Sequence, residues 1–238
     1  MTSLSEQRAL VAQGCRVAAA RGLVDGMLGH LSLRVDDEHL LIRCRSDTDT
    51  GVAFTRPSDV RLIKFDGGAG AAGELDGYRL PNELPIHVQT MLADGRRRAV
   101  AHLHPPAVVA ADLAGIQIRP IYGAHDIPGA WLARDGVPVY DRAVLIRNAA
   151  LGKAMVAAMR GRPVVICRGH GITSAAGTIQ QAVLQAIGLD RLARMSLRVR
   201  AAGGALRDID DADWDDLPDL GPGFNTDAAW RHEVARLG

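Results

Sequence analysis

The sequence predicts an α/β sandwich whose central sheet is not all parallel. Strand patterns and helix patterns alternate along most of the 238 residues, as expected when helices cover a central sheet. The segments "HLSLRV" and "HLLIRCR" alternate apolar and polar residues on either side of the turn-like "DDE" and therefore predict a hairpin. Because a hairpin joins antiparallel strands, an all-parallel sheet is not expected.

Hydrophobic periodicity predicts the elements of the first half of the chain. Residues 5–21 carry apolar side chains at helical spacing and predict an amphipathic helix. After the hairpin come a polar loop "SDTDTG", a strand "RLIKF" and a flexible turn "DGGAGAAGELDG". A second helix is expected from Glu83, because an apolar stripe begins at Leu84 and Pro85 is tolerated in a first turn.

The second half continues this alternation and ends in a different kind of segment. The strand "AVAHL" precedes a short helix "PAVVAADLAG" that ends at a glycine. A helix is expected near 148–160, then a strand "PVVIC", a glycine-flanked turn and a long helix near 178–200. Residues 205–238 are acidic and rich in turns. We expect residues 1–238 to form one domain, with 205–238 as a tail packed on the domain or on a neighbouring subunit.

The composition is that of a globular protein and argues against several classes. Hydrophobic residues make up 47% and charged residues 23% of the chain, values that argue against disorder. The net charge of +1 gives no reason to expect nucleic acid or a membrane surface as a partner. No apolar run is long enough to span a bilayer, the N-terminus lacks a signal-peptide pattern, and the three cysteines form no CxxC motif. We therefore expect a cytoplasmic protein that acts on a small molecule.

Two histidines at a predicted strand end point to a metal site. His102 and His104 are two residues apart, so on a strand they project from one face, with Cα atoms about 6.5–7 Å apart. Two neutral imidazoles placed in this way can bind one ion, and two hydrogen-bonded histidines are the alternative. His170, which lies between two glycines after the strand "PVVIC", is the best candidate for a third ligand.

A carboxylate at the start of the second predicted helix is a candidate for proton transfer. Glu83 lies where the helix dipole favours an anion, which is one sufficient explanation for it. If Glu83 instead reaches the histidines, it can ligate the empty ion and later move away to carry a proton. His87 follows four residues later on the same helix face, and we expect a structural role or a supporting hydrogen bond from it.

In their order and spacing, these motifs resemble the class II aldolase/adducin family. The family pattern is G-N-x-S-x-R, then S-S-E, then H-x-H and a distant N-H-G. The counterparts here are "GHLSLR" at 29–34, "PNE" at 81–83, "HLH" at 102–104 and "GHG" at 169–171. The resemblance runs from about residue 5 to residue 200.

The resemblance implies a fold, an assembly and a set of site residues. It implies a three-layer α/β/α sandwich with a central, largely antiparallel sheet, and a homotetramer with sites at subunit boundaries. It also implies that His102, His104 and His170 hold a divalent metal and that Glu83 is the acid/base. Three imidazoles suit zinc, and manganese, iron or cobalt are alternatives.

Two departures from the family pattern argue against a phosphorylated substrate. In the sugar-phosphate aldolases of the family, the loop asparagine and the serine pair hold the phosphate. This chain has His30 in place of the asparagine and Pro81-Asn82 in place of the serines. Because proline has neither an N–H nor a hydroxyl to donate, a phosphate site built on those groups is damaged.

A pair of arginines suggests a carboxylate instead. Arg43 and Arg45 are placed on one face of a predicted strand, where guanidinium groups suit planar carboxylates, although a solvated strand face is the alternative. With the segments "VVAADLAGIQIRPI" and "DLPDLGPGFN", these features resemble the branch of the family that decarboxylates 3,4-dihydroxyphthalate to protocatechuate and CO₂ in phthalate catabolism. An aldolase acting on a sugar phosphate or sugar acid, and a non-catalytic adducin-like interaction module, are the alternatives.

This resemblance assigns roles to the remaining candidate residues. Glu83, His30 or Tyr122 delivers the proton that replaces CO₂. The substrate is expected to contact a larger set of side chains. These are Arg43, Arg45, Ser32, Asn82, His125 and Arg168. Hydrogen bonds that hold the loops are the alternative role for His30 and His125.

Overall fold

Seven strands form the central sheet of this protein. The computed structural model describes residues 2–238. Along the sheet the strands lie in the order β4-β2-β1-β6-β9-β8-β7, and only β7 and β8 run parallel. The strands are β1 (His30–Arg34), β2 (His39–Arg43), β4 (Val60–Lys64), β6 (Ala99–Leu103), β7 (Val139–Tyr140), β8 (Val164–Cys167) and β9 (Gly171–Ala176). A separate two-stranded ribbon pairs β3 (Arg45–Ser46) with β5 (Tyr78–Arg79).

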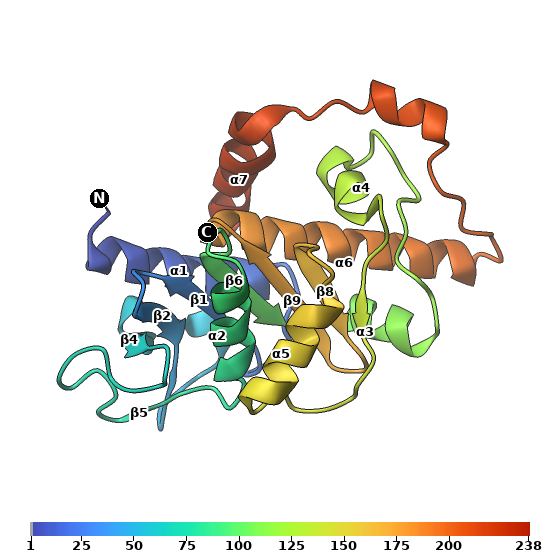
Figure 1. Cartoon of the computed structure of the whole chain (residues 1–238). Helices are drawn as coiled ribbons and strands as arrows, with labels where there is room; N and C mark the ends of the chain where they lie inside the picture. The colour runs from blue at the N-terminus through green and yellow to red at the C-terminus, as the bar shows by residue number, and fades with distance from the viewer. Residues whose placement is uncertain (1) are drawn as a thin grey trace.

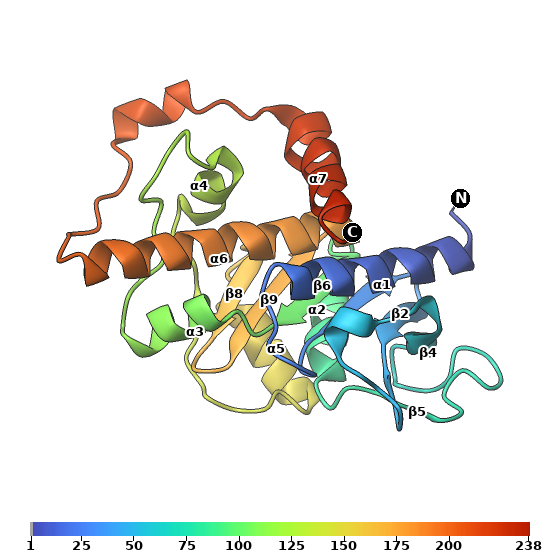
Figure 2. The same ribbon diagram turned by 180° about the vertical axis from the view of Figure 1, so that it is seen from behind.

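Helices cover both faces of the sheet and make it the middle of three layers. Figure 1 shows α2 and α5 in front of the sheet, and Figure 2 shows α1, α3 and α6 on the opposite face. The helices are α1 (Leu4–Ala20), α2 (Leu84–Ala93), α3 (Pro106–Leu113), α4 (Ile127–Ala133), α5 (Ala149–Ala158), α6 (Ile179–Ala201) and α7 (Ala229–Ala235). The expected α/β/α sandwich with a largely antiparallel sheet is confirmed.

Alternation along the strands divides the core into two apolar clusters. In β6, Ala101 and Leu103 join the cluster that includes α1 and α6, whereas Val100 joins the cluster that includes α2 and α5. Successive side chains of a strand point to opposite faces, so His102 lies on the α2 face with Val100. The buried residues of β8 split in the same way between the two clusters.

Local sequence signals explain where the principal helices begin. Ser3 and Glu6 form a capping box at the start of α1, which satisfies two backbone N–H groups that have no partner within the helix. Thr178 caps α6 through a hydrogen bond from the backbone N–H of Gln181. Pro105 follows β6, and Pro106 occupies the first turn of α3, where the missing N–H costs nothing.

Three segments differ from the sequence-based prediction. The strand β9 lies where the glycine-flanked turn before the long helix was expected, because its residues, "GITSAA", are mostly small, are buried on both sides and show no alternation. The strand "HLLIRCR" ends at Arg43, and Arg45 belongs to the separate ribbon. The two arginines therefore do not share one strand. The C-terminal tail also forms helices, including a 3₁₀ helix at Asp211–Asp216 and the helix α7.

The C-terminal tail crosses beyond α6 on the side away from the sheet (Figures 1 and 2). Trp214 and Leu217 pack with Ala130 of α4 in a small third cluster. Trp230 of α7 is buried in the cluster that includes α1 and α6. Among residues 2–238, no helix has the length and apolar character needed to span a membrane.

Candidate metal centre and its pocket

Several strand ends meet at one edge of the sheet, and the candidate residues lie there. The antiparallel register places His30 of β1 opposite His102 of β6, and His102 opposite Thr173 of β9. His104 follows β6 directly, and His170 lies in the turn between β8 and β9. Residues about 70 positions apart in sequence are brought together because β6 pairs with β9.

Four potential ligand atoms converge at this edge. The Nε2 atom of His102 lies 3.3 Å from Nε2 of His170 and 3.1 Å from Nε2 of His104. The Oε2 atom of Glu83 lies 3.3 Å from Nε2 of His102 and 3.4 Å from Nε2 of His170. All four atoms lie within 4.8 Å of one another. The predicted grouping of these four residues is therefore present in the structure.

The donor set fits a divalent cation. In a tetrahedral zinc site with bonds of about 2.0–2.1 Å, two ligand atoms are about 3.3 Å apart. Four of the six distances between these nitrogen and oxygen atoms, from 3.1 to 3.4 Å, lie close to that value, and the other two are within 4.8 Å. Neutral imidazole nitrogens and a carboxylate oxygen are ligands that zinc and related divalent metals accept. The cluster therefore suggests a divalent metal site.

Burial keeps His102 and His104 in the neutral form that binds a metal. Burial and the neighbouring His102 and His170 lower the pKa of His104 to about 3. Burial also lowers the pKa of His102, against the opposing effect of the Glu83 carboxylate. A neutral imidazole keeps a lone pair on one nitrogen for a metal. His102 bonds Thr173 Oγ1 at 3.2 Å through Nδ1, which directs Nε2 towards the cluster.

Glu83 is held at one oxygen and presents the other to the histidines. It is the N-cap residue of α2, and its Oε1 accepts a hydrogen bond of 2.9 Å from the backbone N–H of Ile146. Burial raises the pKa of Glu83, but hydrogen bonds with His102 and His170 outweigh burial and leave the pKa well below its ordinary value. The group is therefore a carboxylate, with Oε2 directed at the histidines and available to a cation.

Two glycines allow His170 to approach the end of β6. Gly169 has φ +58°, a left-handed conformation that glycine adopts without strain. A Cβ atom on Gly171 would lie 2.4 Å from the carbonyl oxygen of Leu103 and 2.7 Å from Cδ2 of His104. Glycine at position 171 is thus required by the close contact between β9 and the end of β6.

A second histidine pair lies behind the cluster. His30 Nδ1 lies 2.7 Å from His87 Nε2, and His87 Nδ1 lies 2.6 Å from Ser32 Oγ. The His30 ring stacks on that of His102 with centroids 5.2 Å apart. His87 is fully buried and makes no approach to the four clustered atoms, as expected for a supporting residue. Ser32 is also fully buried. It bonds His87 and is not part of the pocket lining.

A pocket opens beside the cluster and contains several of the predicted binding residues. Its lining includes His30, Glu83 and His104 from the centre described above, together with Arg45 and the exposed Asn82. Met27, Leu28, Pro81 and Leu145 supply apolar surface. A flat organic acid would therefore meet carbon atoms around a small number of polar groups.

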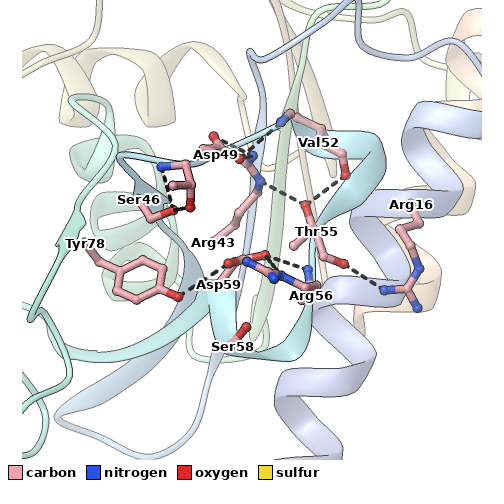
Figure 3. A network of polar contacts seen from close by, with 12 residues as sticks. Arg16, Arg43, Ser46, Asp49, Val52, Thr55, Arg56, Ser58, Asp59 and Tyr78 are labelled. Atoms are coloured by element: carbon pink, nitrogen blue, oxygen red, sulfur yellow. Dashed lines mark hydrogen bonds and ion pairs between the residues drawn. The ribbon is translucent and has the colours of Figure 1, made fainter.

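Arg43 lines the same pocket, but its guanidinium group already forms an ion pair with Asp49. Its Nη2 donates to both carboxylate oxygens of Asp49, at 2.7 and 2.9 Å, and its Nε donates to Thr55 Oγ1 at 3.0 Å. Figure 3 shows this network, in which Thr55 in turn bonds Val52 and Arg16. The predicted pair of substrate-binding arginines is therefore reduced to Arg45, because Arg43 holds the loop that contains Asp49.

Three other predicted site residues lie away from the cluster within this chain. Tyr122 and His125 pack together, with ring centroids 5.1 Å apart, in a separate cavity against α6. Arg168 is half exposed and pairs with Asp141 at 2.8 Å. Adjacency in sequence to His170 placed Arg168 among the candidates, but its side chain lines a different cavity.

Two contributors to the site were not identified from the sequence. Thr173 orients His102, and the backbone N–H of Ile146 holds Glu83. Thr173 would have been identified if β9 had been predicted, because the register pairs it with His102. The Ile146 contact comes from a loop, and no sequence pattern indicates it.

The chain belongs to the class II aldolase and adducin family. Residues 9–197 match the family described as the Class II Aldolase and Adducin N-terminal domain. The fold agrees with a crystal structure of an aldolase II superfamily protein from Pseudomonas syringae. That structure superposes with a TM-score of 0.81 at 20% identity and covers 100% of this chain and 94% of the other.

Particular relatives are much more similar in sequence. A 3,4-dihydroxyphthalate decarboxylase from Rhodococcus jostii is 69% identical, with 99% of this chain and 97% of the relative aligned. A protein of the same name from a Terrabacter species is 60% identical, with 98% and 97% aligned. Both alignments extend through the C-terminal tail, beyond the residues that match the family.

The close contact at Gly171 leads to a test of the metal site. Because its new methyl group would collide with Leu103 and His104, Gly171→Ala should weaken metal binding by about 10–100-fold and destabilise the fold by about 1–3 kcal/mol. Metal affinity is measured by competition with a chromophoric chelator. Gly177→Ala is the matched control, since its nearest neighbour would lie 3.8 Å away. Wild-type affinity in Gly171→Ala would contradict the role given to this contact.

Proposed function

We propose that this protein is a metal-dependent decarboxylase that converts 3,4-dihydroxyphthalate to protocatechuate and CO₂. The observation that carries the proposal is the cluster of Glu83, His102, His104 and His170, which opens onto a pocket containing Arg45. The two relatives described above carry the name of this activity. The chain has lost phosphate-binding groups at positions 81 and 82, which favours a carboxylate over a sugar phosphate.

The proposed mechanism assigns separate tasks to the residues around the pocket. His102, His104 and His170 would hold the metal, with Glu83 as a fourth group that can leave. When bound, a divalent metal supplies Lewis-acid polarisation of substrate oxygens. Arg45 forms an ion pair with the carboxylate that the substrate retains. Asn82 and His30, which line the pocket, would bond further substrate oxygens.

Glu83 is the proposed proton carrier. Its Oε2 takes the proton of the phenol next to the carboxylate that is lost. As the bond from the ring carbon to CO₂ breaks, the electron pair stays on that carbon, and Oε2 returns a proton to it. Solvent then returns a proton to the phenolate oxygen and restores the phenol. The hydrogen bond from Ile146 to Oε1 keeps the carboxylate oriented during both transfers.

The metal and the assembly are part of the proposal. Three imidazoles and one carboxylate suit zinc best, with manganese, iron and cobalt as alternatives. We propose a homotetramer, in which a neighbouring subunit can complete the site. Element analysis of protein purified without chelators should find close to one equivalent of a divalent metal per chain. A value below about 0.1 equivalent would favour a non-catalytic, adducin-like role instead.

A direct assay separates the decarboxylase from an aldolase of the same family. Protein incubated with 3,4-dihydroxyphthalate should release CO₂ and form protocatechuate in equal amounts, because only one carboxylate lies beside a phenol. The control reaction offers dihydroxyacetone phosphate and an aldehyde, and no aldol product is expected. Aldol product without decarboxylation would overturn the proposed function.

Substitutions within the cluster should separate metal binding from turnover. His102→Ala removes a central ligand and should lose metal and activity together. Glu83→Gln keeps the shape of the side chain and should retain metal, but turnover should fall by at least about 100-fold because an amide does not carry the proton. Metal content and kcat are measured on the same samples. Full activity in Glu83→Gln would remove it from the proton-transfer role.

The two arginines of the pocket should behave differently. Arg45→Ala should raise KM for 3,4-dihydroxyphthalate about tenfold and have a smaller effect with 2,3-dihydroxybenzoate, which lacks the second carboxylate. Arg43→Ala should lower the free energy of unfolding by about 3 kcal/mol, because it leaves the Asp49 carboxylate without its partner. Urea denaturation and steady-state kinetics measure these effects, with the exposed Arg79→Ala as a control. Equal KM effects on both acids would exclude an ion pair between Arg45 and the second carboxylate.

A further inference from the structure

A buried hydrogen-bonded chain runs from the sheet to the pocket. It starts at Ser32 Oγ, passes through both nitrogens of His87 and ends at His30 Nδ1, with contacts of 2.6 and 2.7 Å. Ser32 and His87 are fully buried, and His30 is nearly so. His30 is also part of the pocket lining. The chain therefore links the interior of the sheet to a surface that contacts the substrate.

Both imidazoles in this chain are buried and bond no carboxylate. Within residues 2–238, His87 bonds only His30 and Ser32, and His30 bonds only His87, so neither ring has an anionic partner that would stabilise a second proton. A neutral imidazole has one N–H and one lone pair. In a contact between two such rings, one ring must donate and the other must accept. The chain consequently has only two possible directions.

Ser32 decides between these directions. If His30 Nδ1 donated to His87, then His87 Nδ1 would donate to Ser32, and the Ser32 hydroxyl hydrogen would need an acceptor elsewhere. Within residues 2–238, Ser32 Oγ has no hydrogen-bond partner other than His87. A buried donor without an acceptor costs about 1–3 kcal/mol. In the opposite direction every hydrogen is used, because Ser32 donates to His87 Nδ1 and His87 Nε2 donates to His30 Nδ1.

We propose that Ser32 and His87 are positioning residues that fix His30 as the tautomer with its proton on Nε2. His30 then offers an N–H donor to an anionic oxygen in the pocket. A neutral Nε2–H is a hydrogen-bond donor, and its loss as a proton would leave an imidazolate in the pocket, so proton transfer is assigned to Glu83. That this oxygen belongs to 3,4-dihydroxyphthalate rests on the proposed function. The assignment of the His30 tautomer does not depend on it.

Nitrogen-15 NMR of the zinc-loaded protein tests the tautomer without any measurement of activity. In protein labelled at histidine, the His30 signals are identified by their loss in His30→Gln. We expect a protonated Nε2 and an unprotonated Nδ1 for His30, and the same pattern for His87. A proton on His30 Nδ1 in the wild-type protein would overturn the proposal, and this result requires no variant to fold.

Two substitutions at Ser32 test its control of the tautomer. Ser32→Ala removes the only group that favours one direction, so the Nδ1–H form of His30 should become detectable. Ser32→Thr keeps the hydroxyl and should retain the wild-type pattern. An unchanged His30 spectrum in Ser32→Ala would exclude Ser32 as the deciding group. Circular dichroism of each variant verifies that the fold is intact.

Kinetics then distinguish a positioning role from a purely structural one. Ser32→Ala should raise KM for 3,4-dihydroxyphthalate about tenfold and change kcat much less, since a ground-state hydrogen bond is weakened. Ser32→Thr should restore the wild-type KM. A lower amount of active protein with unchanged KM would indicate structural damage and contradict the proposal. If no decarboxylation occurs even in the wild type, the proposed function fails while the NMR result still decides the tautomer.

Discussion

The antiparallel pairing of β6 with β1 and β9 is the constraint on which the site depends. This register places His102 between His30 and Thr173 and brings the His170 turn to the end of β6. A slip of one residue would turn His102 to the opposite face, into the apolar cluster with α1 and α6. Because β6 is apolar and buried on both faces apart from His102, a slip would place this one polar side chain in an apolar cluster, so the apolar core and the metal centre favour the same register.

The helix α2 supplies the groups that complete the site. Glu83 at its N-cap and His87 one turn later lie on one face and both approach the sheet, as residues four apart on a helix do. Glu83 reaches the cluster from the helix end, whereas His87 reaches behind the cluster to His30 and Ser32. The short helix α2 therefore positions both Glu83, the proposed proton carrier, and His87, which bonds and orients His30.

Hydrophobic periodicity and ordered motifs were sufficient to predict much of the fold and the centre of the site. The helices at both ends of the domain, the β1–β2 hairpin and the His102–His104 pair follow from patterns within short windows. The addition of His170, far along the chain, depended on its glycine-flanked turn and on the order of motifs in the family. The strand β9 was missed because small residues buried on both faces have no period. The Arg43–Asp49 pair was also missed, since it forms across a loop that closes only in three dimensions.

The separation of Tyr122 from the cluster has a similar cause. No local pattern shows on which side of α6 a connecting loop lies, and the loop after α3 passes on the far side, where Tyr122 packs with His125. Resemblance assigns a residue to a site by its position in the sequence. The structure shows in addition where that residue lies in three dimensions. Tyr122 lines a separate cavity against α6.

The distribution of charge explains which anion the pocket favours. With neutral imidazoles the four clustered groups carry a charge of −1, which a divalent cation would convert to +1. Asp49 already neutralises Arg43, whereas in the described part of the chain Arg45 has no acidic partner. The pocket then presents two separate positive centres, suited to an acid whose two anionic groups lie on one rigid ring. The family pattern places neutral donors for a phosphate at positions 81 and 82, and Pro81 has neither an N–H nor a hydroxyl to donate there.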